Sequence, residues 1–264
     1  MKITIFTSNQ PRHIALINRL AAVSTTTFAI MECNTVFPGL VQDFYRKSDT
    51  MQDYFSNVMN AERNLFGELS FMSQNVRSLA LKAGDLNFAS REQLIQALDS
   101  DLYIVFGASY IKSWLIDFLI EREAINIHMG LSPYYRGSSC NFWALFDGKP
   151  EYVGATIHRL SKGLDSGPIM YHAVPELQDD NPFEFTMRAV EAAQKSLVER
   201  ISSGEIHHFQ PLQQNKFNEI RYTKNADFSD AVARDFLSRN MDNNTLREMM
   251  STAIRPALHF PYFA

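Results

Sequence analysis

Residues 126–170 read NIHMGLSPYYRGSSCNFWALFDGKPEYVGATIHRLSKGLDSGPIM, and this stretch decides both the fold and the candidate site. Asn126 and His128 end a short apolar run, and alternate residues of a strand face the same side. We therefore expect the amide and the imidazole to point into one space. Asp165 follows in a Lys-Gly-Leu-Asp-Ser-Gly turn, where glycines let the backbone approach a ligand closely. An amide, an imidazole and a carboxylate can together move a proton and stabilise an oxyanion.

Toward the N-terminus, apolar strand-like and helical segments alternate. The residues between 102 and 107 are nearly all apolar, which predicts a central strand buried on both faces. Ser90 followed by Gln93 predicts a capping box that opens a helix ending near Asp99. Strands are predicted over 2–7, 25–31, 102–107 and 124–128, helices over 12–23 and 111–120, a break at Pro38–Gly39, and a long, mostly helical segment from Phe44 to about Ala83. This alternation predicts an α/β fold with a doubly wound, mostly parallel, Rossmann-like sheet, in which ligands bind at the carboxyl ends of strands.

After residue 128 the pattern changes. Two further strands, over 152–160 and 168–174, flank the Asp165 loop and predict an antiparallel excursion that delivers the aspartate. A helix over 181–203 is predicted with Asn181 as N-cap and Pro182 at its first position. We expect one domain over residues 1–204 and a small C-terminal extension over 205–264.

Composition favours a soluble cytoplasmic enzyme. Of 264 residues, 45% are hydrophobic and 20% are charged, and the net charge of −4 does not favour nucleic acid as a partner. Cys33 and Cys140 make neither a disulfide framework nor a zinc site, and the adjacent His207 and His208 point apart, so no metal is expected. No apolar run reaches the roughly 18 residues of a membrane span, so no membrane contact is expected.

Three motifs in order carry a family resemblance. Asn-Ile-His at 126–128, Pro-Tyr-Tyr-Arg-Gly at 133–137 and Leu-Asp-Ser-Gly at 164–167 resemble the signature of the formyltransferases that use 10-formyltetrahydrofolate. That family includes glycinamide ribonucleotide, methionyl-tRNA and sugar N-formyltransferases and formyltetrahydrofolate hydrolase. The resemblance is firm over residues 100–175 and looser over the rest of the first 205. It implies Asn126, His128 and Asp165 as the catalytic trio and 10-formyltetrahydrofolate as the formyl donor, without a metal.

The same resemblance implies two groups of binding residues. The folate pocket is expected from Phe106, Gly107, Ile111, Trp114, Lys162, Gly163 and Leu164. The acceptor side is expected from Ser8, Asn9, Arg12, Tyr135, Arg136 and Gly137, with Arg12 and His13 adding charge. A solvated Arg12, an Asp165 that only caps a turn, and a surface turn at Arg136–Gly137 stay open as alternatives. A homodimer also stays open.

The chain departs from the family pattern in ways that bear on the acceptor. The usual Ser-Leu-Leu-Pro is Gly-Leu-Ser-Pro at 130–133, and Thr-Ser-Asn-Gln-Pro-Arg-His at 7–13 replaces the glycine-rich phosphate loop of the glycinamide enzyme. The tRNA enzyme needs a longer C-terminal barrel. Residues 254–262 resemble the tails of sugar N-formyltransferases, so we expect a nucleotide-linked amino sugar as acceptor. Another amine, water as in the hydrolase, or folate binding without catalysis are the alternatives.

Overall fold

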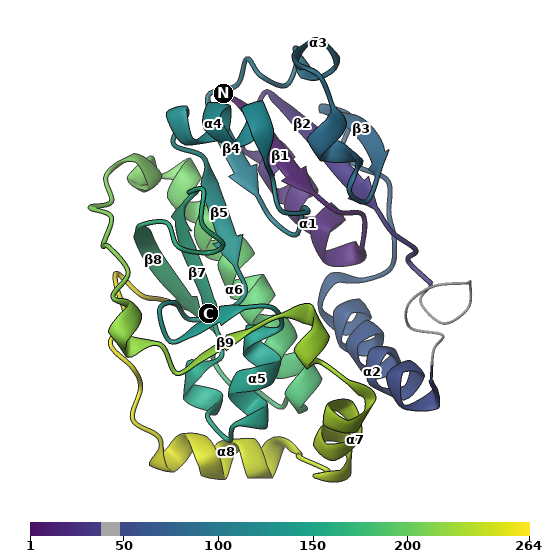
Figure 1. The fold of residues 1–264 in the computed structure, drawn as a ribbon, viewed down its shortest axis with the longest axis vertical. Coiled ribbons are helices and arrows are strands. Elements are labelled where there is room, and N and C mark those ends of the chain that lie inside the picture. The colour runs from purple at the N-terminus through teal and green to yellow at the C-terminus, as the bar shows by residue number, and fades with distance from the viewer. Residues whose placement is uncertain (38–47) are drawn as a thin grey trace.

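The alternation predicted from the sequence produces one large mixed sheet (Figure 1). The structure is a computed structural model that describes residues 1–37 and 48–264, so the predicted break at Pro38–Gly39 and the start of the segment from Phe44 lie outside the described residues. The strand order is β10-β8-β7-β5-β4-β1-β2-β3. Their bounds are β1 Lys2–Thr7, β2 Thr26–Cys33, β3 Val76–Lys82, β4 Leu102–Val105, β5 Ile125–His128, β7 Ala155–Arg159, β8 Ile169–Val174 and β10 Tyr262–Phe263.

The predicted antiparallel excursion is confirmed. Strands β1 to β5 pair in parallel, whereas β7 pairs antiparallel with both β5 and β8. Asn126 therefore faces His158 directly across the β5–β7 pair, and side chains opposite each other lie on the same face of a sheet. The Asp165 loop joins β7 to β8 and returns to the end of β5.

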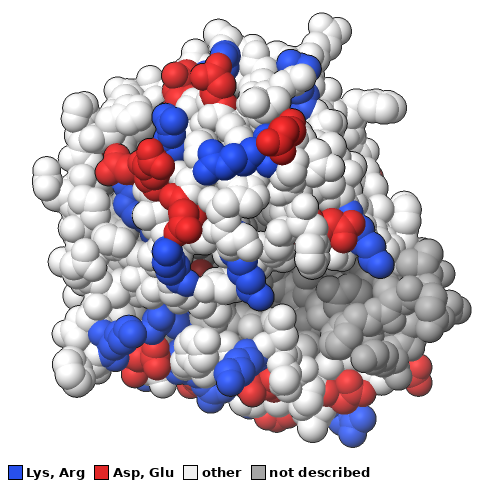
Figure 2. Space-filling view, turned by 45° about the horizontal axis from the view of Figure 1, so that its top comes forward, with Lys and Arg blue, Asp and Glu red and all other residues white. Residues whose placement is uncertain are grey.

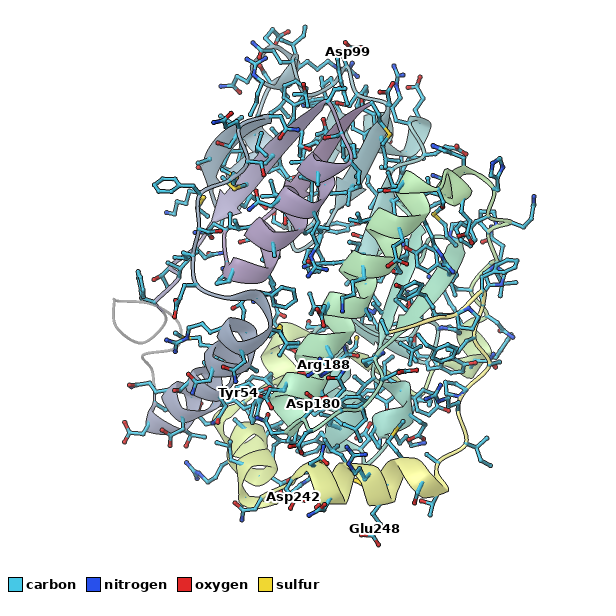
Figure 3. All side chains as sticks on the ribbon, turned by 180° about the vertical axis from the view of Figure 1, so that it is seen from behind. Tyr54, Asp99, Asp180, Arg188, Asp242 and Glu248 are labelled. Atoms are coloured by element: carbon cyan, nitrogen blue, oxygen red, sulfur yellow. The ribbon has the colours of Figure 1, made fainter. Side chains whose placement is uncertain are left out.

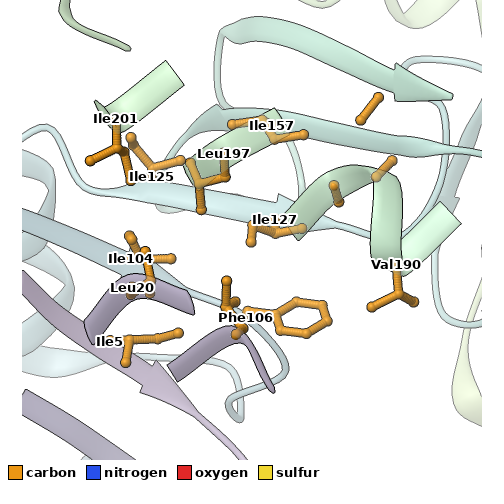
Figure 4. Close-up of a cluster of buried hydrophobic side chains, with 14 of the residues drawn as sticks. Ile5, Leu20, Ile104, Phe106, Ile125, Ile127, Ile157, Val190, Leu197 and Ile201 are labelled. Atoms are coloured by element: carbon orange, nitrogen blue, oxygen red, sulfur yellow. The ribbon is translucent and has the colours of Figure 1, made fainter. Parts of the chain in front are cut away.

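Helices cover both faces of the sheet, as a doubly wound fold requires. The helices are α1 Pro11–Ala22, α2 Asp49–Phe66, α3 Arg91–Leu94, α4 Ser113–Glu121, α5 Cys140–Phe146, α6 Pro182–Ser202, α7 Asp230–Ser238 and α8 Asn243–Thr252. Leu20 of α1 and Leu197 of α6 pack on Ile5 and Ile125 in one core layer (Figure 4), whereas Leu115 of α4 belongs to the opposite layer.

The prediction of a helical segment as far as Ala83 is wrong over β3. Helix α2 ends at Phe66 and is capped by Gly67, whose positive φ of 77° suits glycine, and Val76–Lys82 then pairs in parallel with β2. As the edge strand, β3 leaves polar side chains exposed, so it lacks the apolar run by which the central strands are recognised. The capping box at Ser90 and Gln93 is confirmed, although α3 already ends at Leu94.

Two interactions fix the N-terminus of α6, a side-chain cap and a buried ion pair. The Asn181 side chain accepts from the backbone N–H groups of Phe183 and Glu184, which confirms the predicted cap. Just before it, the buried Asp180 carboxylate accepts from Arg188 Nε at 2.6 Å, and both residues are labelled in Figure 3. A buried carboxylate needs such a partner, so this pair anchors the helix that covers the sheet.

Residues 205–264 return to the rest of the molecule at several points. Strand β9, Arg221–Thr223, pairs in parallel with β6, Tyr135–Gly137, and β10 pairs with β8 at the edge of the main sheet. Phe228 and Phe236, which belongs to α7, pack around Tyr54 of α2. The division of the chain at residue 204 stays a prediction. Among the described residues, no helix is long and apolar enough to span a membrane.

Replacing Leu197 by alanine tests the core layer between α6 and the sheet. Leu197 is fully buried, so Leu197→Ala leaves a cavity and should lower the free energy of unfolding by about 2–5 kcal/mol. Lys195→Ala, on the exposed side of the same helix, should change it by under about 0.5 kcal/mol. Urea denaturation of both variants measures the difference, and equal effects would contradict the described packing of α6.

Candidate active site

The structure brings Asn126, His128 and Asp165 together at the carboxyl end of β5. His128 Nδ1 lies 3.3 Å from Asp165 Oδ2, and Asn126 Nδ2 lies 3.4 Å from Asp165 Oδ1. The Asp165 backbone has a positive φ of 45°, a left-handed conformation in which the short polar side chain of aspartate is better tolerated than most. The side chains of His128 and Asp165 are 6% and 13% exposed, so the pair is largely shielded from water.

Charge is stabilised within this pair. Burial disfavours the imidazolium, but the Asp165 carboxylate and the Cys140 sulfur together outweigh burial, so the pKa of His128 lies well above its ordinary value. Burial likewise raises the pKa of Asp165, but the neighbouring His128 more than offsets it, so this pKa lies below its usual range. Near neutral pH the two therefore form an imidazolium–carboxylate pair. His128 Nε2 faces the carbonyl oxygen of Tyr135 at 3.3 Å.

His158 is a fourth member of the site that no sequence motif indicated. Its Nδ1 lies 2.8 Å from the carbonyl oxygen of Arg159, which can only accept, so Nδ1 carries the proton. Burial lowers the pKa of His158 to about 4, so the ring is neutral and Nε2 accepts. The Asn126 amide nitrogen, 3.0 Å from Nε2, therefore donates to it, which fixes the orientation of the Asn126 amide.

These side chains line a cavity of about 750 Å³, a size typical of small-molecule sites. Of the residues predicted for the folate pocket, Phe106, Gly107, Ile111, Gly163 and Leu164 line it. The Tyr110 hydroxyl donates to the carbonyl oxygen of Lys162, so the two predicted folate segments are joined to each other. The apolar wall is completed by Val105, Ile116, Ile127, Met129 and Leu160.

Trp114 and Lys162 are predicted folate residues whose side chains do not line this cavity. The Trp114 indole N–H donates to the carbonyl oxygen of Ala89 and its ring packs in the core layer of α4. The Lys162 ammonium pairs with Asp117 at 2.7 Å on the surface. Periodicity alone could not separate these residues from their cavity-lining neighbours.

On the predicted acceptor side, only Gly137 and Arg12 line the cavity. The Arg12 guanidinium donates to Glu62 of α2 at 2.8 Å, and the same carboxylate oxygen accepts from the Arg12 backbone N–H, which is one of the free N–H groups of the α1 N-terminus. A protein carboxylate therefore already balances the charge at this end of α1. His13 adds no charge there, contrary to expectation, because burial keeps its pKa well below the ordinary value.

Four other predicted acceptor residues have internal partners instead. Ser8 donates to the carbonyl oxygen of Glu32, and Asn9 exchanges hydrogen bonds with the backbone of Asn34. The Tyr135 side chain is buried, with its hydroxyl on Asp147. Arg136 lies under the Asp165 loop. All of these contacts join segments distant in sequence, so no local pattern could reveal them.

The departure at Gly130 has a steric explanation. A Cβ at this position would lie 2.4 Å from Cys140 Cβ and 2.8 Å from His128 Nε2. Cys140, the first residue of α5, thus occupies the space that a side chain at 130 would need, and its sulfur lies 3.5 Å from His128 Nε2. The described residues contain no group of three or more His, Cys, Asp or Glu side chains that could hold a metal ion.

Comparison with known proteins identifies the family. Residues 50–201 match the family model described as Formyl transferase. The chain belongs to the formyl transferase family. A methionyl-tRNA formyltransferase from Anaeromyxobacter sp. (strain K) is 29% identical to it over 122 residues, 46% of this chain. The match covers only 39% of that relative's length.

Solved structures share the fold of this formyl transferase at low sequence identity. The formyltransferase PseJ from Anoxybacillus kamchatkensis, in complex with UDP-4,6-dideoxy-4-formamido-L-AltNAc and tetrahydrofolate, is 16% identical with a TM-score of 0.51, covering 93% of this chain and 97% of that one. An N-formyltransferase from Helicobacter canadensis, in complex with folinic acid and dTDP-3-aminofucose, is 12% identical with a TM-score of 0.52, covering 87% and 72%. These likenesses establish the α/β fold.

The His128–Asp165 pair predicts a defined pH dependence of stability. The raised pKa of His128 contributes stability that is complete below about pH 6.5, its unfolded value, and is lost as pH rises through the folded pKa. The lowered pKa of Asp165 contributes stability that is complete above about pH 3.9 and is lost as pH falls through the folded pKa. Stability from the pair should therefore be greatest between about pH 4 and pH 6.5.

Asp165→Asn should weaken this dependence, because only Cys140 then offsets the effect of burial, so the pKa of His128 should fall. Histidine ¹⁵N NMR titration and urea denaturation from pH 4 to pH 9 measure both effects. An unchanged His128 titration in the variant would show that the two groups do not interact as described.

Proposed function

We propose that this protein transfers a formyl group from 10-formyltetrahydrofolate to an amine of a nucleotide-linked amino sugar. The observation that supports the reaction best is the Asn126–His128–Asp165 group, which lines a cavity that also has an apolar wall. A cavity of this kind suits a flat pterin ring, whose polar edge can bond to backbone groups. We place the reaction in the cytoplasm.

The proposed chemistry is attack of the acceptor amine on the formyl carbon. A carbon–nitrogen bond forms, the formyl oxygen becomes an oxyanion, and the bond from that carbon to folate N10 then breaks. The amine must lose one proton and N10 must gain one. Donors fixed before the reaction stabilise an oxyanion most, because they need no reorganisation.

Asn126 is suited to be that donor. Its amide is held by His158, whose neutral Nε2 accepts one N–H at 3.0 Å. The second N–H has only a long contact, 3.4 Å to Asp165 Oδ1, and is available to an incoming oxyanion. A reversed amide would present an oxygen to His158 Nε2, which carries no proton. The neutral histidine therefore keeps a donor directed at the site.

Asp165 and His128 are suited to move the proton. The imidazolium stabilises developing negative charge, and the Asp165 carboxylate can accept the amine proton directly or through water and return it to N10. A residue that gives back the proton it takes ends the cycle in its starting form. The raised pKa of His128 keeps the imidazole charged at neutral pH, so the pair begins each cycle as an ion pair.

Two observations support a small amino sugar over tRNA as acceptor. Figure 2 shows a face on which basic and acidic side chains lie interspersed, and the net charge is −4, whereas a protein that binds nucleic acid presents a clustered basic surface. Two structural neighbours are described with UDP- and dTDP-linked sugars. The curated relative named as a methionyl-tRNA enzyme is matched over 39% of its length.

Because Glu62 already occupies the α1 N-terminus, we place the phosphates of the acceptor away from that end of the cavity. Ser138, Ser139 and Asn225 also line the cavity and can donate to phosphate or sugar oxygens without a formal charge. Arg12 borders the same space, and its contact with the acceptor stays a proposal.

Substitution of the trio tests the chemistry. Asn126→Ala, His128→Ala and Asp165→Ala should each lower kcat by at least about 10²-fold, the usual scale for oxyanion donors and acid–base groups. His208→Ala, at an exposed histidine that does not line the cavity, should retain full activity. Formyl transfer from 10-formyltetrahydrofolate is followed with UDP- and dTDP-linked amino sugars, glycinamide ribonucleotide and methionyl-tRNA.

The acceptors separate the alternatives. Formate release without any amine would favour hydrolysis, and turnover only with methionyl-tRNA would overturn the sugar assignment. Near-normal turnover of His128→Ala with a good acceptor would overturn the proposed mechanism.

Ligand binding tests the donor side separately. 5-Formyltetrahydrofolate should raise the melting temperature, because a ligand that binds only the native state stabilises it. Ile111→Ala, which removes an apolar contact from the cavity wall, should weaken the affinity about tenfold, whereas Lys162→Ala should leave it within twofold. Isothermal titration calorimetry measures both. Absence of binding to the unmodified protein at saturating folate would remove the folate assignment.

A further inference from the structure

The loop that carries Asp165 is held in place by a side chain from the C-terminal segment. Gln214 Nε2 lies 2.8 Å from the carbonyl oxygen of Asp165 and 2.8 Å from that of Gly167. Each N–H of the amide therefore donates to one of the two carbonyls that flank Ser166. Within the described part of the chain, Gln214 Oε1 is buried and has no hydrogen-bond partner.

The unpaired oxygen shows which contact determines the orientation of this amide. A buried acceptor without a partner costs free energy, and the opposite amide orientation would place Oε1 against two carbonyl oxygens, which also repel it. Only the observed orientation bonds both loop carbonyls. The Gln214 amide thus bonds the two loop carbonyls while its own Oε1 is left without a hydrogen bond.

Backbone pairing delivers Gln214 to this position. Leu212 and Ile169 form an antiparallel bridge in which each N–H donates to the other's carbonyl at 2.8 Å. In an antiparallel pair the residue numbers run in opposite directions. Two residues after Leu212, Gln214 therefore lies opposite Gly167, two residues before Ile169. The C-terminal segment therefore runs antiparallel to the residues that lead into β8, alongside the loop that brings Asp165 to His128.

A second contact joins the same segment to the same loop. Arg136, 8% exposed, donates to the carbonyl oxygen of Leu164 at 3.1 Å and to Glu219 at 3.0 Å. The loop is thus bonded through its carbonyls at Leu164, Asp165 and Gly167. The Asp165 backbone has a positive φ, which costs free energy for a residue other than glycine and persists only where neighbouring groups fix it.

We propose that Gln214 is a positioning residue for Asp165, through which the C-terminal segment holds the carboxylate against His128. Its catalytic consequence rests on the proposed function, whereas its effect on the His128–Asp165 pair does not. Without the two bonds from Gln214 the loop carbonyls lose their fixed direction, and the 3.3 Å contact between Asp165 Oδ2 and His128 Nδ1 lengthens.

Gln214→Met tests this proposal, because methionine keeps the volume and removes the donor. Gln213→Ala is the matched control, since Gln213 is the exposed neighbour. Gln214→Met should lower kcat between about 10- and 100-fold, the scale of a misplaced catalytic group, with both KM values within about twofold. The control should match the unmodified protein. The ¹⁵N titration of His128 should move to lower pH in Gln214→Met, as the carboxylate withdraws.

Gln214→Glu gives an independent readout that a purely structural role would not produce. A carboxylate repels the two loop carbonyls, whereas a protonated carboxyl can donate to one of them. Activity of this variant, divided by that of the unmodified protein at the same pH, should rise toward acidic pH. A structural defect alone would give a constant ratio.

The outcomes separate this proposal from the proposed function. Gln214→Met that retains the kcat and the His128 titration of Gln213→Ala overturns the positioning role, whatever the reaction proves to be. If the unmodified protein transfers no formyl group, the proposed function fails. The His128 titration in Gln214→Met, compared with that in Gln213→Ala, still decides the positioning role. A kcat that falls while the titration stays unchanged also overturns it.

Discussion

The contact between the Asp165 carboxylate and the His128 imidazole sets the requirements that the surrounding structure meets. Neither group is stable as an isolated charge at this depth, since removing an ion from water costs several kcal/mol. Each needs the other within a few ångströms, and each needs its remaining atoms bonded. Strand β5 fixes the histidine, the antiparallel pair β7–β8 returns the chain with the aspartate, and Gln214 and Arg136 fix the loop carbonyls.

The parallel and antiparallel halves of the sheet contribute different residues to the cavity. The parallel half ends in the apolar wall around Phe106 and Ile111, which has few charges and suits a flat ring. The antiparallel half supplies Asp165 and His158, the polar groups that face Asn126. His128 is charged and His158 is neutral: the Asp165 carboxylate lies 3.3 Å from His128 but 3.9 Å from His158, whose pKa is lowered by burial.

Local sequence pattern predicted the features that depend on neighbours in the chain. Apolar runs predicted the central strands, and the cap at Asn181 predicted the start of α6. The edge strand β3 was missed because its side chains lack that apolar run. His158 could have been found, since it lies on the polar side of the strand predicted over 152–160. The partners Glu62 and Gln214 could not, because their contacts depend on how separate segments pack.

The shared space of Gly130 and Cys140 has a consequence for how this site can change. Because the missing side chain at 130 and the Cβ at 140 would lie 2.4 Å apart, a residue larger than glycine fits at 130 only if α5 shifts or position 140 loses its own side chain. The effect of a mutation at either position is therefore conditional on the other. A serine introduced at 130 before position 140 changes would crowd both Cys140 and His128, so the order of the two mutations matters and the positions should show strong epistasis.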